Sequence, residues 1–390
     1  MKKITAFFIC ISCLLFLTGC HGHRSIQDLT YIVAIGIDYD LDKKEYIVYT
    51  QSIDFMNVAK QEGGRQTEPI PNWIGIGRGK TIYLALSNLF PKSQPPLFLG
   101  HLKAIIFSET ILKHKFKEII SDLGRNETFR YTVNMFATDE SLEKILSQNV
   151  LFHYPPLHNY LSRNTIGSGD TDFIQLMTGK MIVSNYYKPI GSVMIPSFGI
   201  SEHTWKSDGT YPVIYTKGAY FFQQKKYKGF LKMDQLKGFI WKSQRPFKQT
   251  LPIYRDGDLI AVISVFNPTM DIKVREQSLF PTFDIHANVQ ASLVEKRENI
   301  SFSELHEETS KSLKKVIFDT YEHGFKRKLD IFNLGDRWYR FHRHHFKAFS
   351  KSNPSAFYLK KNALKNIELE VEFTNFNSFK YNHHQQNYHD

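Results

Sequence analysis

Cysteine is scarce in this chain of 390 residues, which contains only Cys10, Cys13 and Cys20. Because no thiol follows Cys20, the rest of the chain has neither a disulfide framework nor a cysteine nucleophile. A metal site built on cysteine is excluded there for the same reason. Long apolar runs are also missing. Beyond residue 20 none reaches 18 residues, so the sequence predicts no membrane-spanning helix in that region.

Acidic residues are outnumbered, since 38 Asp and Glu stand against 50 Lys and Arg and leave a net charge of +12. A positive surface suits an anionic partner such as a phospholipid headgroup, a polyanion or nucleic acid. A lysine-rich solvated surface without such a partner explains the same charge. Hydrophobic residues make up 42% and aromatic residues 14%, which excludes a disordered or fibrous chain. The length predicts two or three domains.

The first twenty residues have the pattern of an export signal. A short positive start precedes an apolar run over residues 4–17, too short to cross a bilayer as a stable helix. The run ends in Leu17-Thr18-Gly19-Cys20, which resembles the lipobox of bacterial lipoproteins. We therefore expect residues 1–19 to be a cleaved lipoprotein signal peptide. Cys20 would then become an S-diacylglycerol cysteine and N-palmitoyl cysteine, whereas the alternative is an ordinary signal peptide with a chance cysteine.

Motifs for catalysis and nucleotide binding are incomplete. Residues 75–81 contain Gly79-Lys80-Thr81, but Ile74 stands where a phosphate-binding loop needs its first glycine. A helix N-terminus after a tight turn explains the segment better. No Gly-x-Ser-x-Gly nucleophile elbow occurs, so the sequence predicts no enzyme activity and no cofactor. An anchored cell-wall enzyme stays an alternative, because catalytic groups need only be adjacent in space.

Histidine-rich and basic stretches raise the questions of zinc and of nucleic acid. The histidines are His342, His344 and His345, and His383 with His384. Neither group has a cysteine or paired carboxylates at fitting spacing, so we expect surface histidines and no metal. Basic residues at 225–228 and 326–328 mix with aromatics, but an exported chain favours solvated turns facing anionic headgroups and no nucleic-acid partner.

Hydrophobic periodicity predicts a multi-domain α+β fold of mixed sheets with flanking helices, following the signal peptide. A polar stretch with turn signals at residues 201–210 is the best boundary between domains. We therefore expect an N-terminal α+β region at 20–200, a C-terminal α+β domain at 211–375 and a polar tail at 376–390.

Individual elements follow from local signals. Strands are expected at 29–38, 45–55, 102–108, 130–138, 193–200, 259–266, 270–276, 282–294 and 367–373, with a hairpin at 211–222 and 227–232. Helices are expected at 79–90, 109–123, 139–148 (capped by Asp139), 173–177, 234–241 and from a capping box at Ser301 and Glu304 to Gly324.

Short motifs recur in an order that resembles a known family. In chain order these are the lipobox cysteine, Ala34-Ile35-Gly36-Ile37-Asp38, Gly79-Lys80-Thr81-Ile82 with Ala85, His101, Gly218-Ala219 with Phe221-Phe222, Gly238, Pro281-Thr282-Phe283 with Glu295, and Asp330-Ile331-Phe332 with Gly335. Together they are similar to the Ger(x)C family, the C-subunit lipoproteins of bacterial spore nutrient-germination receptors. The resemblance covers nearly the whole mature chain. It departs in the lead at residues 21–24, which lacks the Trp-Asp usual there.

The resemblance implies a non-catalytic receptor subunit, lipid-anchored on the outer face of the spore inner membrane. It also implies two membrane-embedded partners, an A-type and a B-type subunit, in a complex that responds to small nutrients and triggers germination. The main alternative is a solute-binding lipoprotein that delivers a small ligand to a transporter. Such proteins have two lobes of similar topology, whereas the two halves of this chain differ in pattern.

The segment at residues 330–340 is a candidate for partner contact. It combines Asp330, Asp336 and Arg337 with Ile331, Phe332 and Trp338. Aromatic residues and arginine are enriched at interface hot spots, which favours a surface that binds a partner subunit. A buried corner that closes the second domain is the competing interpretation.

Overall fold

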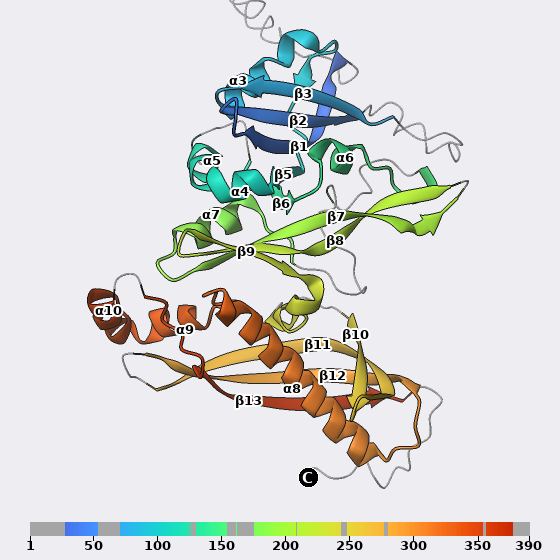
Figure 1. The fold of residues 1–390 in the computed structure, drawn as a ribbon, viewed down its shortest axis with the longest axis vertical. Helices are drawn as coiled ribbons and strands as arrows, with labels where there is room; N and C mark the ends of the chain where they lie inside the picture. The colour runs from blue at the N-terminus through green and yellow to red at the C-terminus, as the bar shows by residue number, and fades with distance from the viewer. Residues whose placement is uncertain are drawn as a thin grey trace, which may run out of the picture.

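Two β-sheets, one of nine strands and one of four, organise the chain in a computed structural model (Figure 1). They succeed each other along the long axis of the molecule, with the first sheet and its helices at one end. The multi-domain α+β prediction is therefore confirmed. The structure describes residues 28–53, 71–123, 125, 130–153, 161, 175–207, 209–242, 248–276, 280–353 and 356–376.

The first sheet has the strand order β3-β2-β1-β5-β6-β7-β8-β9, and β4 pairs with the start of β1. Its centre is parallel from β1 through β5 and β6 to β7, while antiparallel pairs form both flanks. The strands are β1 Thr30–Asp40, β2 Glu45–Ile53, β3 Trp73–Gly79, β4 Leu97–Phe98, β5 Ala104–Ser108, β6 Asn134–Thr138, β7 Ser192–Lys206, β8 Thr210–Gln223 and β9 Lys226–Lys232.

Helices cover both faces of the first sheet. On one face, the apolar sides of α3, α4, α5 and α7 join the largest buried cluster. On the other, α6 packs Leu142, Ile145 and Leu146 against Ala34 and Phe136. The helices are α3 Ile82–Ser87, η3 Phe90–Lys92, α4 Glu109–His114, α5 Phe116–Leu123, α6 Leu142–Ser147, η4 Leu151–His153 and α7 Gly179–Tyr187.

The second sheet has the order β10-β11-β12-β13 and is covered on one face by the long helix α8. Alternate side chains of β12 from Phe283 to Leu293 are buried in the cluster that also holds Leu313 and Ile317 of α8. The elements are β10 Lys248–Arg255, β11 Asp258–Glu276, β12 Thr282–Lys296, α8 Phe302–Lys326, α9 Leu334–Phe341, α10 Arg343–Ser352 and β13 Leu364–Asn375.

Strong local signals predicted several elements correctly. The expected strands that became β1, β2, β5, β12 and β13 are present, as are α3 and the hairpin of β8 and β9. The capping box of α8 is confirmed, because Ser301 N donates to Glu304 Oε2 at 2.8 Å and Glu304 N donates to Ser301 Oγ at 3.2 Å. The helix continues past Gly324 to Lys326.

Several expected elements differ in the structure. The helix expected at 109–123 is two helices, because Lys115 leaves the helical conformation with φ −126°. Ser141, not Asp139, caps α6 by accepting from Lys144 N, and Asp139 instead forms an ion pair with Lys217. The two strands expected at 259–266 and 270–276 are the single strand β11, in which a register shift interrupts the pairing with β12.

Other elements were missed or misplaced. Residues 175–177 are not helical, and α7 starts only after Thr178. Strands β3 and β10 were not predicted. In β3 the pattern is hidden because Gly75, Gly77 and Gly79 occupy the face that contacts α3.

The polar stretch at 201–210 is the distal end of the hairpin formed by β7 and β8, where Lys206 pairs with Thr210. Such an end has the same polar composition as an interdomain linker, which explains the expected boundary. By hydrogen bonding, β8 and β9 belong to the first sheet. The chain passes to the second sheet through two short 3-10 helices, η6 Met233–Leu236 and η7 Phe239–Lys242. The division into 20–200 and 211–375 stays a prediction, and it differs from the sheet pairing by these two strands.

Candidate functional site

The predicted lipidation site, Cys20, lies outside the described residues, and so does the signal peptide before it. Its modification therefore stays a prediction. Within the part of the chain that the structure describes, no helix is both long enough and apolar enough to cross a membrane.

The candidate segment at 330–340 is a buried corner between the two sheets. Ile331, Phe332 and Trp338 are each exposed by 1% or less. These apolar side chains therefore cannot be the contact surface for a partner in this conformation, and the buried-corner interpretation is confirmed for them, whereas Arg337 of the same segment is exposed. The segment does more than close the second domain, since it also contacts the first sheet.

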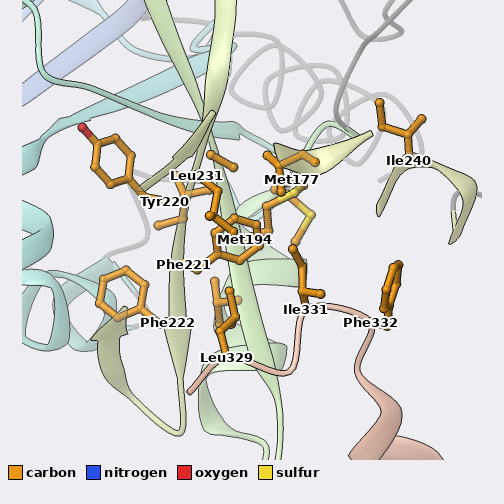
Figure 2. Packing of buried hydrophobic residues seen from close by; sticks show 14 of the residues in the cluster. Met177, Met194, Tyr220, Phe221, Phe222, Leu231, Ile240, Leu329, Ile331 and Phe332 are labelled. Carbon is orange, nitrogen blue, oxygen red and sulfur yellow. The ribbon is translucent and has the colours of Figure 1, made fainter. Parts of the chain in front are cut away.

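We call residues 329–335 and the groups they contact the joint. One part of the joint is apolar packing. Figure 2 shows the chain that carries Leu329, Ile331 and Phe332 beside the strands that carry Met194 and Phe221. All five side chains belong to one buried cluster that extends into both sheets. The core is thus continuous across the joint, so the sheets are packed together and not merely linked.

A buried carboxylate, Asp330, organises the polar part of the joint. Its Oδ1 accepts from Leu334 N at 2.9 Å, and its Oδ2 accepts from Gly335 N at 2.7 Å and from the Tyr358 hydroxyl at 2.5 Å. Burial raises the pKa of Asp330 above its usual value, while these hydrogen bonds and the positive charge of Lys242 oppose that shift. The carboxylate thereby caps the start of α9 and ties it to the loop before β13.

The first sheet contributes two polar contacts to the joint. At the end of β8, Gln223 accepts from Asp330 N at 3.0 Å and donates to Ile190 O at 3.1 Å. At the start of β7, Ser192 donates from its backbone N (3.2 Å) and Oγ (2.5 Å) to the Asn333 side-chain oxygen. Asn333 has φ 52°, a left-handed conformation that asparagine tolerates better than most residues. These bonds fix the corner against two neighbouring strands.

Lys242 at the end of η7 connects the joint to the passage between the sheets. Its Nζ donates to Phe332 O at 2.6 Å. Burial lowers the pKa of Lys242 to about 8, against the opposing attraction of Asp330 and Asp336. Burial therefore outweighs the attraction of the two carboxylates. If the joint opened, Lys242 would be hydrated and its pKa would rise.

Gly335 packs closely against Tyr358, which precedes β13, and this contact holds the joint against the second sheet. A Cβ at position 335 would approach the Tyr358 ring to 2.6 Å, so only glycine fits without displacing the ring. Trp338 lies against the same ring, with centroids 6.1 Å apart. The Asp330 and Gly335 motif of the sequence therefore has a structural reason, which is the fit around one buried tyrosine.

Two cavities border the joint. The larger, of about 640 Å³, is lined by both polar and apolar side chains and lies against β11 and α9, where Arg337 pairs with Asp271 at 2.7 Å. The smaller, of about 130 Å³, lies between α7, β7 and η7 and is lined by apolar side chains such as Met177, Met194 and Phe221 together with polar ones such as Asn185 and Asn333. Lys242 and Asn333 line both cavities, so the joint separates them.

The other sequence candidates are dispersed. His342, His344 and His345 lie where α9 meets α10, and His383 and His384 fall outside the described residues. Among the residues that the structure places, no three His, Cys, Asp or Glu side chains are arranged to hold a metal ion. The glycine-rich residues 75–79 belong to β3, and Thr81 caps α3 by accepting from Leu84 N at 3.1 Å, as the helix-start interpretation predicted.

Sequence reasoning found Asp330 and Gly335 but missed Gln223, Lys242 and Tyr358. Gln223 directly follows the strand predicted at 211–222, and its buried amide gives no sequence signal by itself. Lys242 follows a predicted helix as one of many lysines. Only their contacts with Asp330 and Phe332, which are distant in sequence, distinguish them.

Comparisons with known proteins match both parts of the chain. The family described as "Spore germination protein N-terminal domain" matches residues 22–200. The family described as "Spore germination B3/ GerAC like, C-terminal" matches residues 216–376. The two matches leave out β8 up to Tyr215, whereas hydrogen bonding assigns the whole of β8 to the first sheet.

Individual relatives agree with the family match. The chain is 23% identical over 377 residues to spore germination protein KC of Bacillus subtilis (strain 168), which covers 87% of this chain and 88% of that protein. It is 26% identical over 149 residues to spore germination protein A3 of the same organism, or 38% of each chain. A crystal structure of the GerBC protein superposes with a TM-score of 0.52 at 14% identity, covering 88% of this chain and 97% of that one, and so shares the fold.

Proposed function

The chain belongs to the Ger(x)C family of spore germination proteins, and from that membership we propose that it is a non-catalytic, lipid-anchored subunit of a nutrient-germinant receptor. In this proposal it acts with membrane-embedded A-type and B-type subunits on the outer face of the spore inner membrane. The observation that carries the proposal is the family match to both parts of the chain, at 22–200 and 216–376.

The joint supports a role as a body that holds partners in a fixed arrangement. Its buried groups bond to one another and to backbone atoms, as in the contacts of Asp330 and Lys242. A continuous core across the joint means that a force on one sheet is transmitted to the other. A solute-binding lipoprotein is expected to have two lobes of similar topology. This chain instead has one sheet of nine strands and one of four, which disfavours that alternative.

Lipid attachment at Cys20 supplies the membrane anchor in this proposal. Each buried methylene contributes about 0.8 kcal/mol, and two acyl chains hold a protein at the surface where one gives only marginal attachment. The net charge is +12, and two of the lysines that contribute to it lie in the signal peptide. The remaining positive charge adds an attraction to anionic lipid, which salt screens. Lipid therefore dominates the attachment.

The test is chemical cross-linking in membranes of spores that produce the protein. We expect capture of multi-pass membrane proteins of the A and B types, because the receptor is a complex of three kinds of subunit in this proposal. Recovery of homo-oligomers or wall fragments alone would contradict the receptor role. As a control for the anchor, a chain with residues 1–20 replaced by a cleavable signal without a junction cysteine should be released from membranes of a host that lacks the partners. Its retention there after a high-salt wash would show that the anchor lies elsewhere.

A further inference from the structure

Exposed aromatic side chains gather at one end of the first sheet. Trp73 at the start of β3 is 66% exposed, Phe90 of η3 is 41% exposed and Phe98 of β4 is 38% exposed. We call these three residues the aromatic rim. They lie in the region of β3 and β1, which the strand order places at the opposite side of the first sheet from β8 and the joint (Figure 1).

Strand register places Trp73 and Phe98 at the same end of the first sheet. Trp73 pairs with Ser52, the next residue of β2 pairs with Tyr31, and Tyr31 pairs with Phe98. Trp73 and Phe98 are therefore at the same end of four adjacent strands, one register position apart. Because neighbouring residues of a strand alternate between faces, their side chains project from opposite faces of that end. With strands about 4.8 Å apart, three spacings separate them by roughly 14 Å.

Phe90 reaches the same end through the turn after α3. The side chain of Leu89, its neighbour, lies against Gly75, two residues from Trp73 on the same face of β3. The chain that follows Phe90 continues to Pro95 and Pro96, whose carbonyls accept from Thr30 Oγ1 at 2.8 Å and Thr30 N at 2.9 Å. The segment that links Phe90 to Phe98 is thus hydrogen-bonded to the first residue of β1.

The predicted anchor enters the fold at this same point. Cys20 precedes Thr30 by ten residues, and an extended chain covers at most about 3.6 Å per residue. A lipid on Cys20 therefore keeps the start of β1 within roughly 36 Å of the bilayer. Because Thr30 immediately precedes Tyr31, the partner of Phe98, the anchored chain enters the first sheet at the end where the rim lies.

The chemistry of the rim suits the lipid headgroup region. Tryptophan and other aromatic rings are enriched at the boundary between hydrocarbon and water, where an apolar ring can be buried beside polar groups. Lys92, two residues after Phe90, is exposed and carries the charge that anionic headgroups attract. The lipid anchor would keep the exposed rim residues close to a bilayer, which is an apolar surface that they can contact.

We propose that the aromatic rim inserts into the headgroup region of the anionic bilayer to which Cys20 is anchored, and so sets the orientation of the body on the membrane. This inference rests on the lipid anchor of the proposed function. A single point of attachment limits only the distance of the body from the membrane, whereas a second contact at another point restricts its rotation as well. The joint and the second sheet are then held away from the membrane surface.

The experiment uses the four tryptophans of the chain. Trp241 and Trp338 are fully buried, whereas Trp73 and Trp205 are exposed. In the full-length lipidated protein, Trp205→Phe leaves Trp73 as the only exposed tryptophan, and Trp73→Phe leaves Trp205. Trp205 lies on β7, five strands from β3 and roughly 24 Å away across the sheet, so it is a matched control.

Both variants are reconstituted into vesicles of phosphatidylglycerol and phosphatidylcholine, with and without brominated acyl chains. We expect bromine to quench the Trp205→Phe variant at least twofold more than the Trp73→Phe variant, with a blue shift of Trp73 emission on membrane attachment. Equal quenching of the two variants would overturn the proposal. So would protection of Trp73 from acrylamide without quenching by bromolipid, since a protein and not lipid would then cover the rim.

Flotation of the same vesicles separates this inference from the anchor on which it rests. Protein that floats with the vesicles but shows no bromine quenching of Trp73 contradicts the rim alone. Protein that does not float contradicts the lipid anchor and the rim together. Quenching of Trp73 in floating protein supports both.

Discussion

The two sheets differ in how they are covered. In the first, the central strand β1 has seven consecutive buried residues, because helices pack on both of its faces. In the second, β12 alternates between buried and more exposed residues, because α8 covers only one face. The open face is polar, with His286 opposite Glu368 and Asn288 opposite Glu370 on neighbouring strands. The second sheet therefore depends on one helix and on the joint for its burial.

This difference makes the joint more important to the second sheet than to the first. The contacts of the joint come largely from the chain between α8 and β13, which includes Asp330, Gly335 and Tyr358. The first sheet contributes the ends of strands that are already held by their neighbours, such as Gln223 and Ser192. Loss of the joint should therefore weaken the second sheet first.

The largest effect on the joint is expected for Asp330→Ala. The change leaves the Tyr358 hydroxyl and the backbone N–H groups of Leu334 and Gly335 buried without an acceptor, which costs about 3 kcal/mol or more. We expect urea unfolding to separate into two transitions, the second sheet melting first. The exposed Asp42→Ala is the control and should stay near the parent. A single transition at the parental midpoint for Asp330→Ala would contradict the dependence on the joint.

The next effect tests the first sheet, through Gly77→Ala. A Cβ at position 77 would meet Ala85 O at 2.1 Å, so α3 must move away from β3. Forced overpacking of this kind costs about 1–3 kcal/mol. Because β3 is the edge strand farthest from the joint, we expect the free energy of unfolding to fall while the two sheets still unfold in a single transition. Gly209→Ala is the matched control, since a Cβ there has no neighbour within 4 Å, and equal unfolding midpoints for the two variants would refute the prediction.

The contrast between the sheets also explains what the sequence could predict. The alternation at 282–294 and 367–373 and the capping box of α8 are local signals, so the second sheet was mostly predicted. In the first sheet, β1 and β5 were predicted as continuous apolar runs, but the glycine-rich β3 was not. Glycines have no hydrophobicity pattern, and the reason for them is the approach of α3.

The candidate site was predictable only in part for a related reason. Asp330 and Gly335 stand close together in a recognisable motif, but their partners Gln223 and Tyr358 are 107 and 28 residues from Asp330. The sequence left open whether residues 330–340 bind a partner or form a corner. Burial decided between these, and burial depends on contacts that are not local.

A smaller effect concerns the pH dependence that Lys242 gives to the joint. Burial lowers the pKa of Lys242 to about 8 in the folded chain, against 10.5 for the ordinary lysine of the unfolded chain. Between these values the unfolded state binds more protons, so the contribution of Lys242 to stability rises with pH from about 8 to 10.5. We expect the free energy of unfolding of the parent, minus that of Lys242→Met, to rise by about 1–2 kcal/mol between pH 8 and pH 10. A difference that is flat or falls with pH would show that Lys242 is not destabilised by burial.

The smallest effect is expected on the open face of the second sheet, for Glu368→Gln. Glu368 Oε2 lies 2.6 Å from His286 Nδ1, but the Glu368 side chain is 54% exposed, so water and salt screen the pair. Removal of the charge should change the free energy of unfolding by about 0.5 kcal/mol or less. Ile285 precedes His286 on β12, and its side chain is buried on the opposite face, toward α8. Ile285→Ala should therefore cost about 2–5 kcal/mol. Urea unfolding of the two variants therefore measures the two faces of one sheet. A cost above about 1 kcal/mol for Glu368→Gln would contradict the prediction, because the pair would then be shielded from water and salt.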